Sequence, residues 1–168
     1  GRAACVASAE AMIAAGRHGE AADRLEPLCR AADSPACAAL HPLLLGKNLP
    51  TRDSTRFFEI FNAACNQPDG GEMCADAALV AAGLAELPGY AAYRDWNKVA
   101  GPGEKGCILG ENNACIAMGM LYFDKGSSRR DLAKSVPYFL EACNLGDVSG
   151  CWGVTNALME LPDPALGQ

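Results

Sequence analysis

Eight of the nine cysteines form four close pairs that recur along the 168-residue chain. Seven residues stand between the members of three pairs and eight in the fourth; the pairs are Cys29 and Cys37, Cys65 and Cys74, Cys107 and Cys115, and Cys143 and Cys151. The first cysteines of successive pairs lie 36, 42 and 36 positions apart. A close pair repeated at a near-constant period predicts a repeat architecture with one disulfide in each repeat.

Other residues keep the same register as the cysteines. Twelve positions before the first cysteine of the last three pairs stands an aspartate that follows an arginine: Arg52-Asp53, Arg94-Asp95 and Arg130-Asp131. Four positions after every first cysteine stands an acid: Asp33, Asp69, Glu111 and Asp147. The first set predicts helix N-caps, whose carboxylates accept free backbone N–H groups, and the second set is expected to begin the following helices. Gly110 and Gly146 suit left-handed C-caps.

Each unit is therefore predicted to be two helices joined by a tight turn, with a cysteine on either side of the turn. An eight-residue step along a straight helix spans about 12 Å, whereas the Cα atoms of a disulfide lie within about 7 Å. The pairs can bond only if the chain reverses between their members. Helices are expected over 3–15, 19–32, 35–46, 53–66, 71–86, 91–109 (interrupted), 113–124, 131–145 and 149–160. No segment alternates with period two, so almost no strand is expected.

The period fails around residues 87–104. The interval from the second cysteine of a pair to the next cap aspartate is 21 positions after Cys74, against 16 after Cys37 and Cys115. Proline inside a helix removes a hydrogen bond, so the 91–109 helix is expected to break or restart at Gly103 and Pro137 to kink or shorten its own helix. Two interpretations stay open: drift in a degenerate repeat, or a partner surface reshaped over 87–104, with Tyr90, Tyr93 and Trp96 exposed beside it.

The bulk composition limits the partners. The formal charge of −6 and the pI of about 4.9 argue against nucleic acid and anionic membranes as main partners. No apolar run approaches the length of a membrane span, so none is predicted. Gly1 is expected to lie beyond a signal cleavage site or at an artificial start of the chain.

The cysteine spacing favours disulfides over a metal site. Zinc sites usually show shorter gaps or Cys/His clusters, and here the only histidines are His18 and His41. No metal and no cofactor are predicted. Four structural disulfides imply an oxidising compartment, either periplasmic or secreted. Cys5 has three open interpretations, a buried free thiol, the partner of an upstream cysteine or an intermolecular link, and we expect a buried or unpaired thiol.

No catalytic pattern accompanies the repeat. The segment 101–106 fits G-x-G-x-x-G, but it follows no predicted strand and opens no βαβ unit. S-x-x-K, G-x-S-x-G and H-E-x-x-H do not occur in the chain. We therefore expect no enzymatic activity.

The C-terminal part of the chain resembles a known repeat family. The segments 117–126, 130–134 and 141–147 are similar to Sel1-like repeats, and specifically to the disulfide-stapled form of the Helicobacter cysteine-rich protein family. Four residues occupy the family's Leu-Gly-x-x-Tyr…Gly…Asp positions: Gly119, Tyr122, Gly126 and Asp131. The resemblance covers 95–155 best and 29–75 less closely. It implies an all-α fold, an α/α superhelical repeat related to TPR arrays, in which the first helix of each pair lines a concave surface.

Together these patterns predict one repeat domain over 1–168, with helix pairs near 1–32, 35–66, 71–109 and 113–145 and a terminal helix at 149–160. The predicted function is an exported, non-enzymatic and monomeric scaffold that binds a protein or peptide partner through a preorganised groove. Candidate binding residues on the first helices are His41, Asp76, Asn113 and Met118, and those from the irregular segment are Tyr90, Tyr93 and Trp96. Two alternatives stay open: an immunity or inhibitor protein for a secreted toxin, and, because some cysteine-rich family members bind penicillin and hydrolyse it slowly, a β-lactam-binding protein with weak β-lactamase activity.

Overall fold

The computed structural model describes residues 1–46, 49–84, 92 and 94–162. The helices in this part of the chain are α1 (Arg2–Ala14), α2 (His18–Arg30), α3 (Ser34–Leu45), α4 (Ser54–Cys65), α5 (Gly71–Ala81), α6 (Trp96–Ile108), α7 (Asn112–Phe123), α8 (Leu132–Asn144) and α9 (Val148–Glu160). No strand occurs within the described ranges. The expected all-α class is confirmed.

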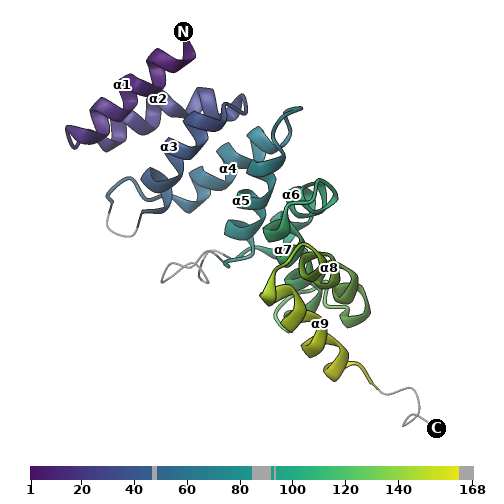
Figure 1. Cartoon of the computed structure of the whole chain (residues 1–168). Helices are drawn as coiled ribbons and strands as arrows, with labels where there is room; N and C mark the ends of the chain where they lie inside the picture. The colour runs from purple at the N-terminus through teal and green to yellow at the C-terminus, as the bar shows by residue number, and fades with distance from the viewer. Residues whose placement is uncertain (47–48, 85–91, 93, 163–168) are drawn as a thin grey trace.

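The helices form an elongated array that runs from α1 at one end to α9 at the other (Figure 1). Each helix packs on the next one along the chain, and α5 and α7 also pack on each other, as do α2 and α4. This stacking is an α/α superhelical repeat with one disulfide in each turn. None of the helices that the structure describes is long and apolar enough to cross a membrane.

The four disulfides pair the cysteines as the spacing predicts, with Cα atoms 4.6–4.7 Å apart. Each joins the end of an even-numbered helix to the start of the next odd-numbered helix. In the three shorter turns the residue after the C-cap has a positive φ: Ala32 (57°), Gly110 (83°) and Gly146 (93°). The N–H of the following acid donates back to the preceding helix, for example from Glu111 to the Gly106 carbonyl (2.9 Å). A single acid therefore both ends one helix and begins the next, which makes the reversal tight enough for a disulfide.

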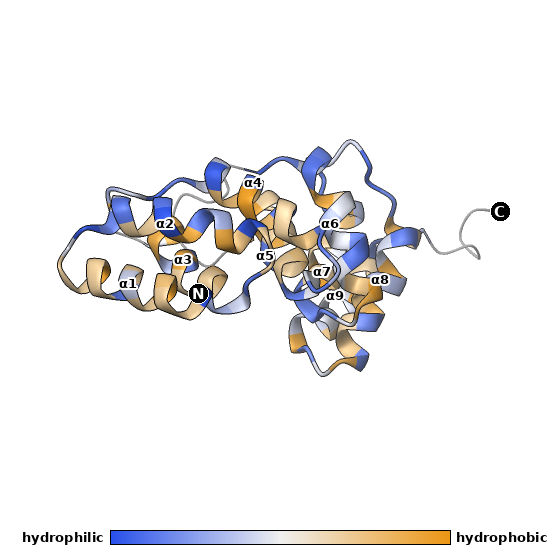
Figure 2. Cartoon of the chain, turned by 90° about the horizontal axis from the view of Figure 1, so that it is seen from above, coloured by the Kyte–Doolittle hydropathy of each residue, from blue (hydrophilic) through white to orange (hydrophobic). Residues whose placement is uncertain are grey.

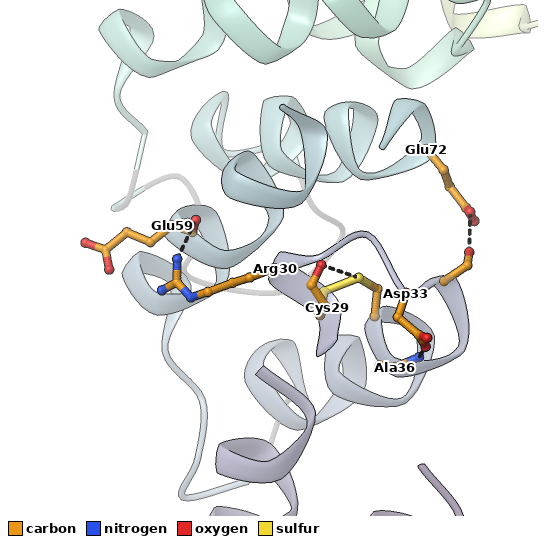
Figure 3. The surroundings of a disulfide bond; sticks show 8 residues. Cys29, Arg30, Asp33, Ala36, Glu59 and Glu72 are labelled. Atoms are coloured by element: carbon orange, nitrogen blue, oxygen red, sulfur yellow. Dashed lines mark hydrogen bonds between the residues drawn. A yellow bond between two sulfur atoms is a disulfide. The ribbon is translucent and has the colours of Figure 1, made fainter. Parts of the chain in front are cut away.

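Figure 3 shows the first of these turns. The carboxylate of Asp33 accepts the N–H of Ala36 at 3.1 Å, which caps α3. On one side of the turn Arg30 donates to a backbone carbonyl of α4, and on the other side Ser34 Oγ donates to Glu72 Oε2 of α5 at 3.1 Å. The turn is thus held by the disulfide, by its own cap and by the next repeat.

The predicted aspartate caps are confirmed. The side chains of Asp53, Asp95 and Asp131 accept backbone N–H groups in the first turns of α4, α6 and α8. Two of the acids in the second set differ. Glu111 occupies the N-cap of α7 without a side-chain cap bond, and Gly70 rather than Asp69 is the N-cap of α5. The Cys65–Cys74 turn contains one more residue than the others, which moves the helix start past Asp69.

The arginines before two of the cap aspartates, Asp95 and Asp131, have a role that the sequence did not suggest. The Nε atoms of Arg94 and Arg130 donate to carbonyls at the ends of α5 and α7. Both guanidinium groups also form an ion pair with an acid near the end of the odd-numbered helix that follows: Arg94 with Asp124 (3.2 Å) and Arg130 with Glu160 (2.7 Å). The Arg-Asp dipeptide therefore connects three helices and fixes one repeat against the next.

The expected break in α6 is wrong. The helix runs from Trp96 to Ile108 without interruption, and α8 likewise runs unbroken through Pro137. A Cβ atom at Gly103 would lie 2.7 Å from Met118 Sδ, and one at Gly106 would lie 2.6 Å from Ala114 Cβ. These glycines let α6 pack closely on α7, and this packing holds the helix together across the hydrogen bond that Pro102 lacks.

The end of α5 and the start of α6 also differ from the prediction. Helix α5 ends at Ala81 rather than near residue 86, because Gly83 has a φ of 66° and forms a left-handed C-cap. Helix α6 begins at Trp96 rather than near residue 91, directly after the Asp95 cap.

The buried side chains differ along the array. The core around α2, α3 and α4 consists of large residues, and its fully buried members include Leu25, Leu40, Leu44, Phe57, Ile60 and Phe61. Farther along, large buried side chains are fewer, among them Met118, Leu121 and Phe139, and α9 buries only Gly150 and Ala157. Figure 2 shows that polar residues gather at the turns between helices, while apolar residues follow the helix bodies.

Cys5 forms no disulfide within the described chain, and it is exposed on α1. The interpretation of Cys5 as a buried free thiol is therefore wrong.

Candidate binding groove

Four odd-numbered helices, α3, α5, α7 and α9, share one groove with a volume of about 1010 Å³. Several residues that line the groove stand at fixed distances along the chain from the second cysteine of each pair. Ile116 and Trp152 directly follow the second cysteine of their pairs, and Leu79, Met120 and Asn156 each stand five positions after it. Equivalent positions of successive repeats therefore face the same space, because each disulfide fixes its odd-numbered helix at the same point.

Three of the predicted binding residues line this groove: His41, Asp76 and Asn113. The structure brings them together from α3, α5 and α7. Sequence reasoning missed Ile116, Met120 and Trp152, although their fixed spacing from the second cysteines was a signal that could have found them.

Met118 does not line the groove. It stands two positions from both Ile116 and Met120, which places it on the opposite side of α7, where it is buried against Gly103 of α6. It belongs to the core.

Trp96 is also buried, contrary to the expectation of an exposed aromatic residue. It is 9 % exposed and packs in a cluster with Val99 and Leu121, and the Arg94 guanidinium lies 5.1 Å from its ring centre. Tyr90 and Tyr93 lie outside the described residues. In the described part of the irregular segment, 94–104, no residue lines the groove.

Asp76 and His41 face each other across the α3–α5 end of the groove, with Asp76 Oδ1 4.0 Å from His41 Nε2. The His41 ring packs edge-on against Phe57, with ring centres 5.2 Å apart, which fixes its position. Burial raises the pKa of Asp76 above its ordinary value; His41 opposes this rise, while Glu72 and Glu111 add to it. A smaller cavity of about 190 Å³ adjoins this end and shares both His41 and Asp76.

Asp147, the second carboxylate of the groove, is already engaged within the protein. It accepts hydrogen bonds from the Asn112 side chain (2.8 Å) and from the backbone N–H groups of Ser149 and Gly150. The hydrogen bond from Asn112 is the main reason that the pKa of Asp147 lies below its ordinary value, and the two backbone donors add to it. Asp76, in contrast, accepts no hydrogen bond from any described residue.

The α7–α9 end of the groove is mainly apolar. Ile116, Met120 and Phe123 project from α7, and Trp152 projects from α9 with 64 % of its surface exposed. The side-chain amides of Asn113 and Asn156 have no hydrogen-bond partner among the described residues. No lysine or arginine occurs among the groove-lining residues that the structure describes. Nor do the described residues contain a group of three or more His, Cys, Asp or Glu side chains placed to hold a metal ion.

The fold and the groove define the class of this protein: a disulfide-stapled α/α repeat array with a groove along its odd-numbered helices. Comparison with protein-family models, curated proteins and solved structures gives no match. The resemblance to Sel1-like repeats stays a prediction from the motifs. The four intramolecular disulfides indicate an oxidising, exported compartment.

Proposed function

We propose that this protein is an exported, non-enzymatic scaffold that binds a protein or peptide partner in the groove of α3, α5, α7 and α9. In this proposal it is a divergent Sel1-like repeat protein that acts as a monomer in the periplasm or outside the cell. The observation that carries the proposal is the groove itself, which runs across four helices and combines exposed apolar side chains with polar groups that have no partner in the described chain.

The shape of the groove favours an elongated occupant. Pockets for small molecules usually enclose about 300–1,000 Å³ and bury most of the ligand. This groove is at the upper limit of that range, and its lining residues come from successive repeats along the array. An extended or helical peptide segment contacts all four helices at once, whereas a compact ligand does not.

The disulfides support binding because they fix the groove before the partner arrives. Each one holds an odd-numbered helix against the preceding even-numbered helix, close to the positions that line the groove. A preformed site loses less conformational freedom on binding than a flexible one.

The proposal is tested by selecting binders to the oxidised protein from a random linear peptide library displayed on phage. Selected peptides are then synthesised and titrated against Trp152→Ala, with Met159→Ala as the matched control. Both residues are exposed apolar side chains of α9, but only Trp152 lines the groove. We expect Trp152→Ala to weaken binding about tenfold or more, because exposed aromatic anchors dominate such interfaces, and Met159→Ala to leave it unchanged. If no selected peptide distinguishes the two variants, the groove is not the binding site.

A further inference from the structure

We infer that the groove recognises a partner segment carrying a lysine or arginine, whose cation pairs with Asp76, while neighbouring apolar residues of the segment pack on Ile116, Met120 and Trp152. This inference rests on the proposed function and specifies the chemistry of the partner.

The carboxylate of Asp76 accepts no hydrogen bond from the residues that the structure describes. Its side chain retains 32 % exposure, and the nearest cationic group, His41 Nε2, stands 4.0 Å away. A partly desolvated carboxylate that accepts no hydrogen bond is less stable than a paired one, so this side chain gains from a cationic partner. Five other aspartates cap α3, α4, α6, α8 and α9, and their side-chain oxygens accept hydrogen bonds from backbone N–H groups. Asp76 has no such role within the fold.

The titratable groups around Asp76 are mainly acidic. The titratable groups that face it are His41 from α3, Glu72 from its own helix and Glu111 from the start of α7. Glu72 also lines the adjoining small cavity together with Asp76. Three carboxylates against one imidazole make this end of the groove attractive to a cation and repulsive to phosphate or another anion. Burial is the main cause of the raised pKa of Asp76, and Glu72 and Glu111 raise it further.

Apolar side chains line both ends of the groove. Leu79 and Val80 lie at the α3–α5 end with Asp76, and Ile116, Met120 and Trp152 lie between α7 and α9, farther along the array (Figure 1). Trp152 offers a large exposed ring there, and Ile116 and Met120 complete the wall beside it. A segment that fits both ends therefore needs a basic residue and apolar residues at separate positions, which is the property of a peptide chain.

The test uses the peptides selected on the wild-type protein. In each peptide the lysine or arginine is replaced in turn by norleucine, which keeps an aliphatic chain and removes the cation. We expect the selected peptides to share a basic position and the norleucine replacement at that position to weaken binding about tenfold. This measurement requires no change to the protein.

Asp76→Asn completes a double-mutant cycle with the same peptides. We expect this variant to lose most of the preference for the basic peptide over the norleucine peptide, because the pairing group is gone and only the electrostatic attraction of Glu72 and Glu111 remains. Asp69→Asn is the matched control: it removes the same charge at an exposed position outside the groove. It should keep the full preference for the basic peptide, and Asp76→Asn should fold normally because it removes a desolvated charge.

The outcomes separate the two proposals. Peptides that depend on Trp152, but share no basic residue or keep their preference on Asp76→Asn, would overturn the Asp76 pairing and leave the peptide groove standing. Peptides that do not depend on Trp152 at all would overturn the groove and this inference together.

Discussion

The α2–α4 region and the α7–α9 region follow the same repeat plan but are stabilised differently. In α2–α4, long aliphatic and aromatic side chains fill the space between helices, and the rings of Phe57 and Phe61 stack with centres 3.9 Å apart. In α7–α9, the ring of Phe139 packs against glycines of both neighbouring helices, and the rings of Tyr122 and Tyr138 stack with centres 5.8 Å apart. The two regions share the arrangement of their helices but differ in how many large buried side chains stabilise them.

The Phe139 ring packs edge-on against Phe123 of α7, with centres 6.0 Å apart, and otherwise lies close to glycines of the neighbouring helices. A Cβ atom at Gly119 of α7 would lie 2.4 Å from the ring, and one at Gly153 of α9 would lie 2.5 Å from it. Meanwhile large apolar side chains of α8 and α9, including Leu140, stay on the surface. The comparison teaches that the α7–α9 region relies on a few large buried side chains and its disulfide, whereas the α2–α4 region distributes the packing over many large residues.

The largest expected effect comes from Phe139→Ala, which tests whether the two regions are stabilised differently. Removing a fully buried phenylalanine is expected to destabilise its region by about 3–5 kcal/mol. Because repeats contact mainly their neighbours, hydrogen exchange should lose protection in α7–α9 and keep it in α2–α4. Leu140→Ala, at the adjacent exposed position, should have little effect. Equal loss of protection across the whole chain would contradict the regional difference.

The disulfides give the next largest effect. Replacing both members of Cys143–Cys151 by alanine is expected to cost up to about 2.5 kcal/mol through loop entropy, and the same holds for Cys29–Cys37. The structural consequence should differ. Helix α9 buries little and should exchange freely once it is released, whereas α3 carries Leu40 and Leu44 in the core and should stay protected. Hydrogen exchange on the two double variants measures this directly, and similar protection of α3 and α9 would remove the distinction.

The turns allow a paired test of smaller size. The same left-handed position is alanine in the α2–α3 turn (Ala32) and glycine in the α8–α9 turn (Gly146). Gly146→Ala is expected to destabilise the protein by about 1 kcal/mol, because a Cβ atom disfavours this conformation. Ala32→Gly should stabilise it by about 0.5 kcal/mol, since the relief of strain exceeds the added freedom of the unfolded chain. Urea unfolding measures both, and two changes of the same sign would contradict the shared geometry.

The smallest expected effect concerns an ion-pair network found in the α2–α4 region. Burial by itself raises the pKa of Glu26, but hydrogen bonds from Arg56 and Arg30 outweigh it and leave the pKa below its ordinary value. The carboxylate therefore stabilises the fold above the pKa it has in the unfolded chain, about 4.3, and this contribution is lost as the pH falls through the lower folded value. Glu26→Gln should cost about 1 kcal/mol or less at pH 7.

The measurement is the difference in unfolding free energy between wild type and Glu26→Gln at several pH values. The difference should be constant at neutral pH and shrink below about pH 4.3. A difference that grows on acidification would show that the arginines do not stabilise the charged form of Glu26.

Much of the local structure was predictable from the sequence. Asp53, Asp95 and Asp131 cap helices as expected, because a cap depends on the few residues that follow it. The disulfide pairs were also predictable, since both partners lie on one short turn. The continuity of α6 through Pro102 was not, because it depends on the close packing of Gly103 against Met118, fifteen positions farther along the chain.

The candidate site was predictable only in part. His41, Asp76 and Asn113 were expected on the helices that line the groove, and they do line it, whereas Met118 and Trp96 pack in the core. The repeat period tells which helix a residue belongs to. It does not tell which face of that helix meets a neighbour, because helix rotation follows from the packing of side chains across repeats.

The sequence by itself determined the repeat, its helix boundaries to within a few residues in most cases, its disulfides and its oxidising compartment. Each of these follows from residues close together in the chain, where backbone hydrogen bonding and covalent geometry leave few choices. Only the tertiary structure decided that Asp76 accepts no hydrogen bond from the described residues, that Trp152 stands exposed in the same groove, and that Phe139 packs against three glycines. Those features depend on helices one to three repeats apart, and their relative positions are set by how the side chains between them pack.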